Sequence, residues 1–124
     1  MRMKRSRIKT FFTRKAITVK DGEGSTSTDY DKAIAFQGES WPAGGKVQAE
    51  LYGNRLSYIR NVKVDGKYHT KTDEKGMLHY IFENGMDLIE NDGVCLYVSA
   101  DRTPDYKIIS IKPYRPLMLE VERI

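Results

Sequence analysis

The side chains best suited to chemistry are one cysteine and two histidines. Cys95 lies within an alternating apolar run, which is typical of a packed thiol rather than of a nucleophile activated by a nearby base. His69 and His79 also lie in alternating segments, with no His or Glu at metal-ligand spacing. We therefore predict an inert thiol, two partly exposed strand histidines, and no catalytic residue, metal or cofactor.

Acidic pairs could in principle supply acid–base chemistry. They occur at positions 29 and 31, 73 and 74, 101 and 105, and as four acids between 83 and 92. None reproduces the calcium-loop spacing that ends in a bidentate Glu, although distant strands could bring two carboxylates together. The Gly-Glu-Gly at 22–24 lacks the strand–turn–helix context of a phosphate-binding loop. We expect that the protein is not an enzyme.

Charge is distributed unevenly along the chain. Residues 1–20 hold eight Lys or Arg and no acid, which leaves 13 basic and all 17 acidic residues to positions 21–124. A basic arm on a mildly acidic body suits contact with phosphate or with an acidic protein surface, or it serves solubility alone. The arm residues that we single out as candidate contacts with DNA or a partner are Arg2, Lys4, Arg5, Arg7 and Lys9.

Length and composition favour one small domain. A chain of 124 residues can bury a core, and one cysteine cannot form an internal disulfide. No apolar segment of signal-peptide length follows the basic start, and no run approaches the roughly 20 apolar residues of a membrane span. We expect a single domain over 1–124, with a flexible basic arm at 1–9, a long mobile loop region at 21–45 and a β-barrel body at 46–124.

The sequence pattern predicts that the elements that position these residues are β-strands. Alternation over 94–98, 106–111 and 117–122 predicts a three-strand ladder at the C-terminus. Turn dipeptides at 65–66, 75–76, 84–85 and 92–93 recur at the spacing typical of all-β barrels and sandwiches, with strands between them at 67–72, 77–82 and 86–89. The predicted fold class is therefore all-β, a small barrel with long loops.

The first half of the chain is less regular. The pattern predicts a strand over 10–20, broken near Arg14-Lys15, a Gly- and Ser-rich loop over 21–28, a short strand over 30–37 and an irregular stretch over 38–45. Loops of such length are usually functional or become ordered on a partner. As a candidate assembly loop we take Asp21, Gly24, Asp29, Tyr30 and Trp41.

Residues 52–64 and Trp41 each have two possible interpretations. Residues 46–51 alternate as a strand, whereas 52–64 fit a strand and a short helix near 52–62 equally well. Trp41 is the only tryptophan, and in a loop it would either plug one end of the barrel or form a binding hot spot.

Three segments together resemble the short head–tail connector proteins of tailed phages, which are also called head-closure or stopper proteins. They are Gln48-Ala-Glu-Leu-Tyr-Gly-Asn-Arg-Leu-Ser-Tyr-Ile-Arg60, Gly93-Val-Cys-Leu-Tyr-Val98 and Asp105-Tyr-Lys-Ile-Ile-Ser-Ile-Lys-Pro-Tyr114. The Ala-x-x-Tyr-Gly-x-Arg-Leu segment and the late Tyr-Lys-Ile-Ile-Ser-Ile run are most similar to the version in defective, PBSX-like prophages of Gram-positive bacteria.

The resemblance implies a non-enzymatic barrel with long loops and a short helix beside it. Such proteins dock as a ring on the portal or its adaptor ring, close the DNA channel and offer a surface to the tail-completion proteins. The ring would lie in the bacterial cytoplasm during assembly and then in the virion or phage-like particle, with its basic arm near packaged DNA. No membrane partner is implied.

A different class of function also fits the residues. Basic side chains near Phe11 and Phe12, with eight tyrosines along the chain, are compatible with a small nucleic-acid-binding barrel. Against it, positions 21–124 are net acidic, and strand tyrosines commonly pack. A third alternative is a small regulator that binds a protein through the loop.

Overall fold

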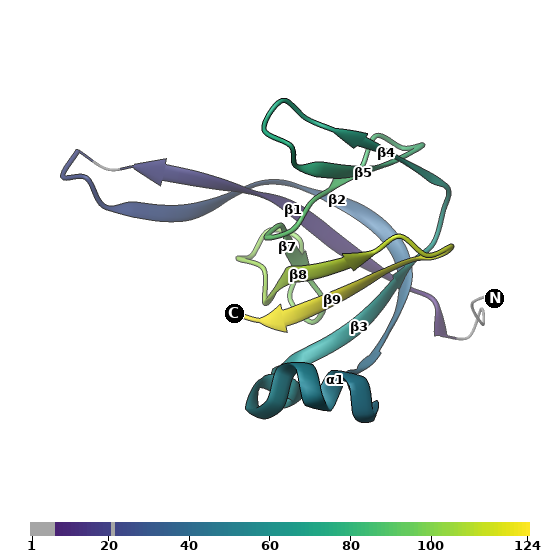
Figure 1. Cartoon of the computed structure of the whole chain (residues 1–124). Coiled ribbons are helices and arrows are strands. Elements are labelled where there is room, and N and C mark those ends of the chain that lie inside the picture. The colour runs from purple at the N-terminus through teal and green to yellow at the C-terminus, as the bar shows by residue number, and fades with distance from the viewer. Residues whose placement is uncertain (1–6, 21) are drawn as a thin grey trace.

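A computed structural model describes residues 7–20 and 22–124 and contains two β-sheets and one short α-helix (Figure 1). In chain order the elements are β1 (Lys9–Lys20), β2 (Thr26–Pro42), α1 (Gly45–Tyr52), the 3-10 helix η2 (Gly53–Tyr58), β3 (Ile59–Val64), β4 (Tyr68–Thr72), β5 (Leu78–Phe82), β6 (Asp87–Leu88), β7 (Gly93–Cys95), β8 (Tyr106–Lys112) and β9 (Leu117–Arg123). Among the described residues, no helix is long and apolar enough to cross a membrane.

Six strands close into a barrel in the order β1-β2-β3-β9-β8-β7, and β4-β5-β6 form a separate small sheet. All neighbouring strands are antiparallel, including the C-terminal ladder β7-β8-β9. The prediction of an all-β barrel is therefore confirmed. It succeeds because alternating side chains on each strand must divide between a core and an outer face.

The core lies inside the barrel and continues beneath the small sheet. Val62, Val64 and Leu119 are fully buried where β3 runs beside β9, and Phe82 and Leu88 from the small sheet belong to the same apolar cluster. The small sheet is too limited to be stable alone, so burial against the barrel holds it in place.

The long loop region predicted over 21–45 is wrong, because β2 occupies most of it, whereas the short strand predicted over 30–37 is confirmed as part of β2. Thr26 and Thr28 are β-branched, which favours a strand, and Thr28 pairs with the β-branched Thr18 of β1. The hairpin register runs from Lys20↔Thr26 to Lys9↔Gly38. Gly38 is a strand residue because β3 passes very close: an added Cβ would lie 2.2 Å from the Lys63 carbonyl oxygen. The predicted break near Arg14-Lys15 corresponds to a register shift between Arg14 and Ala16.

The predicted strand over 46–51 is also wrong, since these residues form α1. Over 52–64, where a strand and a short helix fitted equally well, both occur: η2 is helical and β3 begins at Ile59. In α1 the inward positions are polar: Gln48 contacts the barrel, whereas Val47 and Leu51 are 76% and 66% exposed. Because the helix is held by polar side chains, apolar periodicity could not reveal it.

The strand expected over 94–98 ends at Cys95. The carboxylate of Asp105 accepts the backbone N–H groups of Leu96 (2.9 Å) and Tyr97 (3.0 Å), which replaces ladder partners there. Three of the four expected turns contain a glycine at positive φ, but at 92–93 Asn91 adopts the positive φ and Gly93 is a buried strand residue.

Candidate functional site

The most prominent feature outside the core is a projecting two-stranded arm, the hairpin arm, which we define as residues 16–20 and 22–30. Figure 1 shows this part of the β1–β2 hairpin extending well beyond the barrel. Within the described residues, β1 pairs with β7 only over Phe12–Arg14 and β2 pairs with β3 only over Gly38–Pro42. The outer edges of the hairpin arm therefore have no third strand beside them.

Apolar side chains are exposed on this arm. Ile17 is 45% exposed and Val19 is 41% exposed, opposite Asp29 and Ser27 on the same face. A two-stranded hairpin without a covered face is marginally stable in water. Unpaired strand edges and exposed β-branched side chains are the features that a partner strand or surface can cover.

Arg14 fixes the base of the hairpin arm. Its guanidinium donates to the carbonyl oxygens of Asp31 (2.6 Å, Nε) and Tyr30 (2.8 Å, Nη2) on β2, and to that of Arg102 (2.9 Å, Nη1) in the β7–β8 connection. The five donors of a guanidinium allow one side chain to satisfy three carbonyls from two segments. This contact ties the base of the hairpin arm to the β7–β8 connection, which follows the barrel strand that pairs with β1.

Lys15 and Asp92 form a second anchor at the register shift. Lys15 Nζ donates to Asp92 Oδ2 at 3.0 Å, and the same carboxylate accepts the backbone N–H groups of Ala16 and Ile89, each at 3.2 Å. Asp92 is only 1% exposed. Its burial raises the pKa of the carboxyl above its ordinary value, although Lys15 and the two amides lower it in part.

The residues of the expected assembly loop are brought to different places. Asp21 lies outside the described residues. Gly24 is in the hairpin turn with φ of +87°, and Asp29 is exposed on β2, where it accepts its neighbour's backbone N–H. Tyr30 lies half-buried at the base of the arm, close to Gly93.

Trp41 is separated from these residues and lies in β2, not in a loop. Its strand neighbour Ser40 pairs with the fully buried Val62, so Trp41, paired with Asn61, faces outward. The indole is half-buried, and Lys63 Nζ lies 5.5 Å from its ring centroid. The interpretation of Trp41 as a core plug is therefore wrong.

The basic arm is only partly covered by the structure, because Arg2, Lys4 and Arg5 lie outside the described residues. Lys9 is the first residue of β1 and pairs with Gly38, so the ordered hairpin begins inside the expected flexible segment. Arg7 forms an ion pair of 3.6 Å with Glu39. Both cations line a depression that also contains Trp41.

A buried polar group under α1 was not anticipated. Glu120 is 1% exposed and accepts from Gln48 Nε2 at 2.8 Å, with Lys112 Nζ 3.4 Å away. Burial acts to raise the pKa of Glu120, but these contacts and a hydrogen bond from Tyr52 leave it lowered. Burial and Glu120 together raise the pKa of Tyr52 to about 12. The network attaches the helix to the barrel.

The cysteine and the histidines are placed as the sequence predicts. Cys95 is 1% exposed, and burial raises the pKa of its thiol, which disfavours the nucleophilic thiolate. His69 is exposed, and the partly exposed His79 lies between Asp73 and Asp87, each 2.8 Å from a ring nitrogen. Because the two carboxylates contact opposite nitrogens, they orient the ring and do not converge on a shared site.

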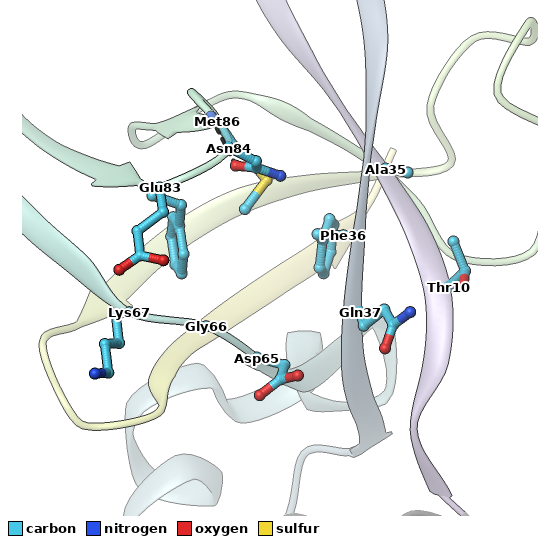
Figure 2. A pocket seen from close by; sticks show the side chains of 11 residues that line it. Thr10, Ala35, Phe36, Gln37, Asp65, Gly66, Lys67, Glu83, Asn84 and Met86 are labelled. Atoms are coloured by element: carbon cyan, nitrogen blue, oxygen red, sulfur yellow. Dashed lines mark hydrogen bonds between the residues drawn. The ribbon is translucent and has the colours of Figure 1, made fainter.

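A pocket of about 350 Å³ separates the barrel wall from the small sheet (Figure 2). Figure 2 shows Phe36 between the strands of the barrel and the turn that carries Asn84 and Met86, with Lys67 and Glu83 at one rim. Phe36 and Met86 are already buried as part of the core. Among the residues the structure describes, no group of three or more His, Cys, Asp or Glu side chains could hold a metal ion, here or elsewhere.

The sequence matches no protein-family model, and neither a curated protein nor a solved structure is significantly similar to it. Fold and surface alone therefore define the class: a small closed β-barrel with a side sheet and a long hairpin arm anchored at its base. In the sequence, Arg14 and Lys15 stand out only as a predicted break in a strand. The alternation of Ala16 to Lys20 with a matching Ser-Thr run was the signal that could have revealed the arm.

Proposed function

We propose that this protein is a structural, non-enzymatic assembly component of the head–tail connector kind. In this role it docks as a ring on the portal or adaptor ring of a phage or prophage particle, closes the DNA channel and offers an attachment surface to the tail. The single observation that supports the proposal most directly is the hairpin arm, which is exposed, has no third strand along either edge among the described residues, and is anchored at its base.

An arm of this kind suits assembly because its stability is incomplete in the free protein. Covering Ile17 and Val19 against a neighbour would remove apolar surface from water, and each would contribute on the order of 1 kcal/mol from its remaining exposure. Charged side chains such as Lys20 and Asp29 disfavour indiscriminate strand pairing. Small contacts of this size become strong when many copies in a ring form them together.

The rest of the fold agrees with what the resemblance implies. Connector proteins of this family are expected to be small barrels with a short helix beside them, and α1 lies beside β3 and β9. The anchors formed by Arg14 and Lys15 would transmit force between a docked arm and the barrel. A rigid connection favours ring assembly. If the arm were hinged at its base, each subunit would lose conformational entropy when its arm docked, and binding would be weaker.

The proposed partners are the portal or adaptor ring, the tail-completion proteins and further copies of this chain. The proposed location is the bacterial cytoplasm during assembly, followed by the finished particle. Packaged DNA would pass through the ring, so basic residues close to the N-terminus would face phosphate there.

The test is co-sedimentation with purified, tailless, DNA-filled heads from the same source as the protein, after nuclease treatment of free DNA. We expect saturable binding that survives nuclease and reduces leakage of DNA. The arm variant Ile17→Thr with Val19→Thr should bind at least about 10-fold more weakly, since it keeps strand propensity but loses apolar surface.

A matched control is Val47→Thr on α1, which alters an even more exposed apolar residue far along the chain from the arm. It should bind as the wild type does. The proposal would be overturned by a wild-type protein that fails to bind heads, or by binding that disappears with nuclease. Equal loss in the arm variant and the control would contradict the role of the arm.

A further inference from the structure

A second surface, on the outer wall of the barrel, combines an aromatic ring with positive charge. Trp41 and Lys63 project from β2 and β3, with the Lys63 ammonium 5.5 Å from the centre of the indole. Arg7 and Lys9, near the start of the described residues, border the same depression as Trp41, which has a volume of about 360 Å³. We call these four residues the Trp41 patch.

Charge in the Trp41 patch is positive after its acid is counted. Glu39 lies in the depression and is the ion-pair partner of Arg7 at 3.6 Å. One carboxylate against two Lys and one Arg leaves a net charge of +2, on a body whose residues beyond position 20 are net acidic. The side chain of Arg7 is 61% exposed, so it can contact a ligand while it remains near Glu39.

The wall next to Trp41 is covered by α1, whereas Trp41 itself is partly exposed beside the depression. Asn61 pairs with Trp41 in the sheet but is 3% exposed, because Gln48 from α1 hydrogen-bonds to it. The indole is only half-buried. A nearby cation over a Trp face is favourable and holds the ring in one orientation, so a flat ligand meets a preorganised surface.

We infer that the Trp41 patch binds single-stranded nucleic acid, with a base stacked on the indole and phosphates beside Arg7, Lys9 and Lys63. Stacking platforms interleaved with cations are how small barrels hold single strands without reading sequence. A duplex is a poorer ligand, because its bases are already stacked and cannot reach the ring. The inference does not rest on the proposed connector role, and neither does its test.

Trp41 is the only tryptophan, so its fluorescence reports on this surface alone. We would titrate the full-length protein with oligo(dT) of about 12 nucleotides and follow that emission. We expect saturable quenching, and a slope of about −2 in log K against log salt, because each of three cations contributes about 0.7 for a single strand. A duplex of equal length should bind at least about 10-fold more weakly.

Variants are compared by the anisotropy of a labelled oligonucleotide. Trp41→Ala should weaken binding about 10-fold. Trp41→Phe keeps a ring and should lose no more than about three-fold, which separates stacking from a folding defect. Lys9→Ala should weaken binding and reduce the salt slope by about 0.7, whereas the control Lys75→Ala, in the exposed β4–β5 turn, should bind like the wild type.

Three results would overturn the inference. These are unchanged Trp41 fluorescence at saturating oligonucleotide, equal affinity of Trp41→Ala and wild type, and binding of duplex as tightly as of the single strand. The last result would indicate a purely electrostatic contact with phosphate. Each is measured on the isolated protein, so it is distinguishable from a failure to bind phage heads.

Discussion

Replacing Asp92 with Asn tests how strongly the buried Asp92 carboxylate stabilises the base of the hairpin arm. The change keeps the size of the side chain but removes its charge and one of its two acceptor oxygens. Asp92 is 1% exposed and accepts from Lys15 at 3.0 Å and from the backbone of Ala16 and Ile89 at 3.2 Å each. The amide nitrogen of Asn would therefore have to face at least one of these donors.

The cost can be worked out from those contacts. Losing a charge-assisted hydrogen bond costs about 1.5–3 kcal/mol, and leaving a buried N–H unsatisfied costs about 1–3 kcal/mol. Burial raises the pKa of the Asp92 carboxyl, so removing its charge recovers part of the desolvation cost. We expect Asp92→Asn to reduce the free energy of unfolding by about 2–3 kcal/mol, which lowers the melting temperature by about 10 °C.

The assay is urea unfolding followed by circular dichroism, with Asp29→Asn as the control because Asp29 is exposed on the arm. Lys15→Met, which keeps the aliphatic stem, should cost less, about 0.5–1 kcal/mol, because Lys15 is 33% exposed and solvent screens its charge. The double variant should show coupling between the two sites. An Asp92→Asn protein within about 0.5 kcal/mol of wild type would refute the reasoning.

Two further predictions concern other parts of the fold. Gly38→Ala places a Cβ 2.2 Å from the Lys63 carbonyl oxygen, so β2 and β3 must move apart. We expect the free energy of unfolding, measured by heat or urea, to fall by at least about 1–3 kcal/mol. Unchanged stability would show that the two strands lie farther apart than this. Hydrogen bonds to Asp73 and Asp87 raise the pKa of His79 above its ordinary 6.5, so its stabilising contribution is fully present below pH 6.5 and is lost as the pH rises through the folded-state pKa. His79→Gln should therefore cost more stability at about pH 5.5 than at about pH 8.5, and an equal cost at both would contradict this.

The sequence by itself determined the architecture of the second half of the chain. Alternation from Tyr106 to Ile111 and from Leu117 to Glu122 became β8 and β9, since a strand with one buried face must place apolar residues at every second position. The turns at Gly66, Gly76 and Gly85 also formed as expected, because few residues other than glycine adopt their positive φ.

Tertiary contacts decided the first half of the chain. The Ser- and Thr-rich residues 25–28 resemble a loop in isolation, but Thr26 to Thr28 form the beginning of β2 because β1 supplies a partner strand beside them. Likewise α1 is held by the buried carboxylate of Glu120 through Gln48, two residues that lie 72 positions apart in the chain. Local periodicity carries no information about a partner that distant, and both the hairpin arm and the Trp41 patch depend on such partners.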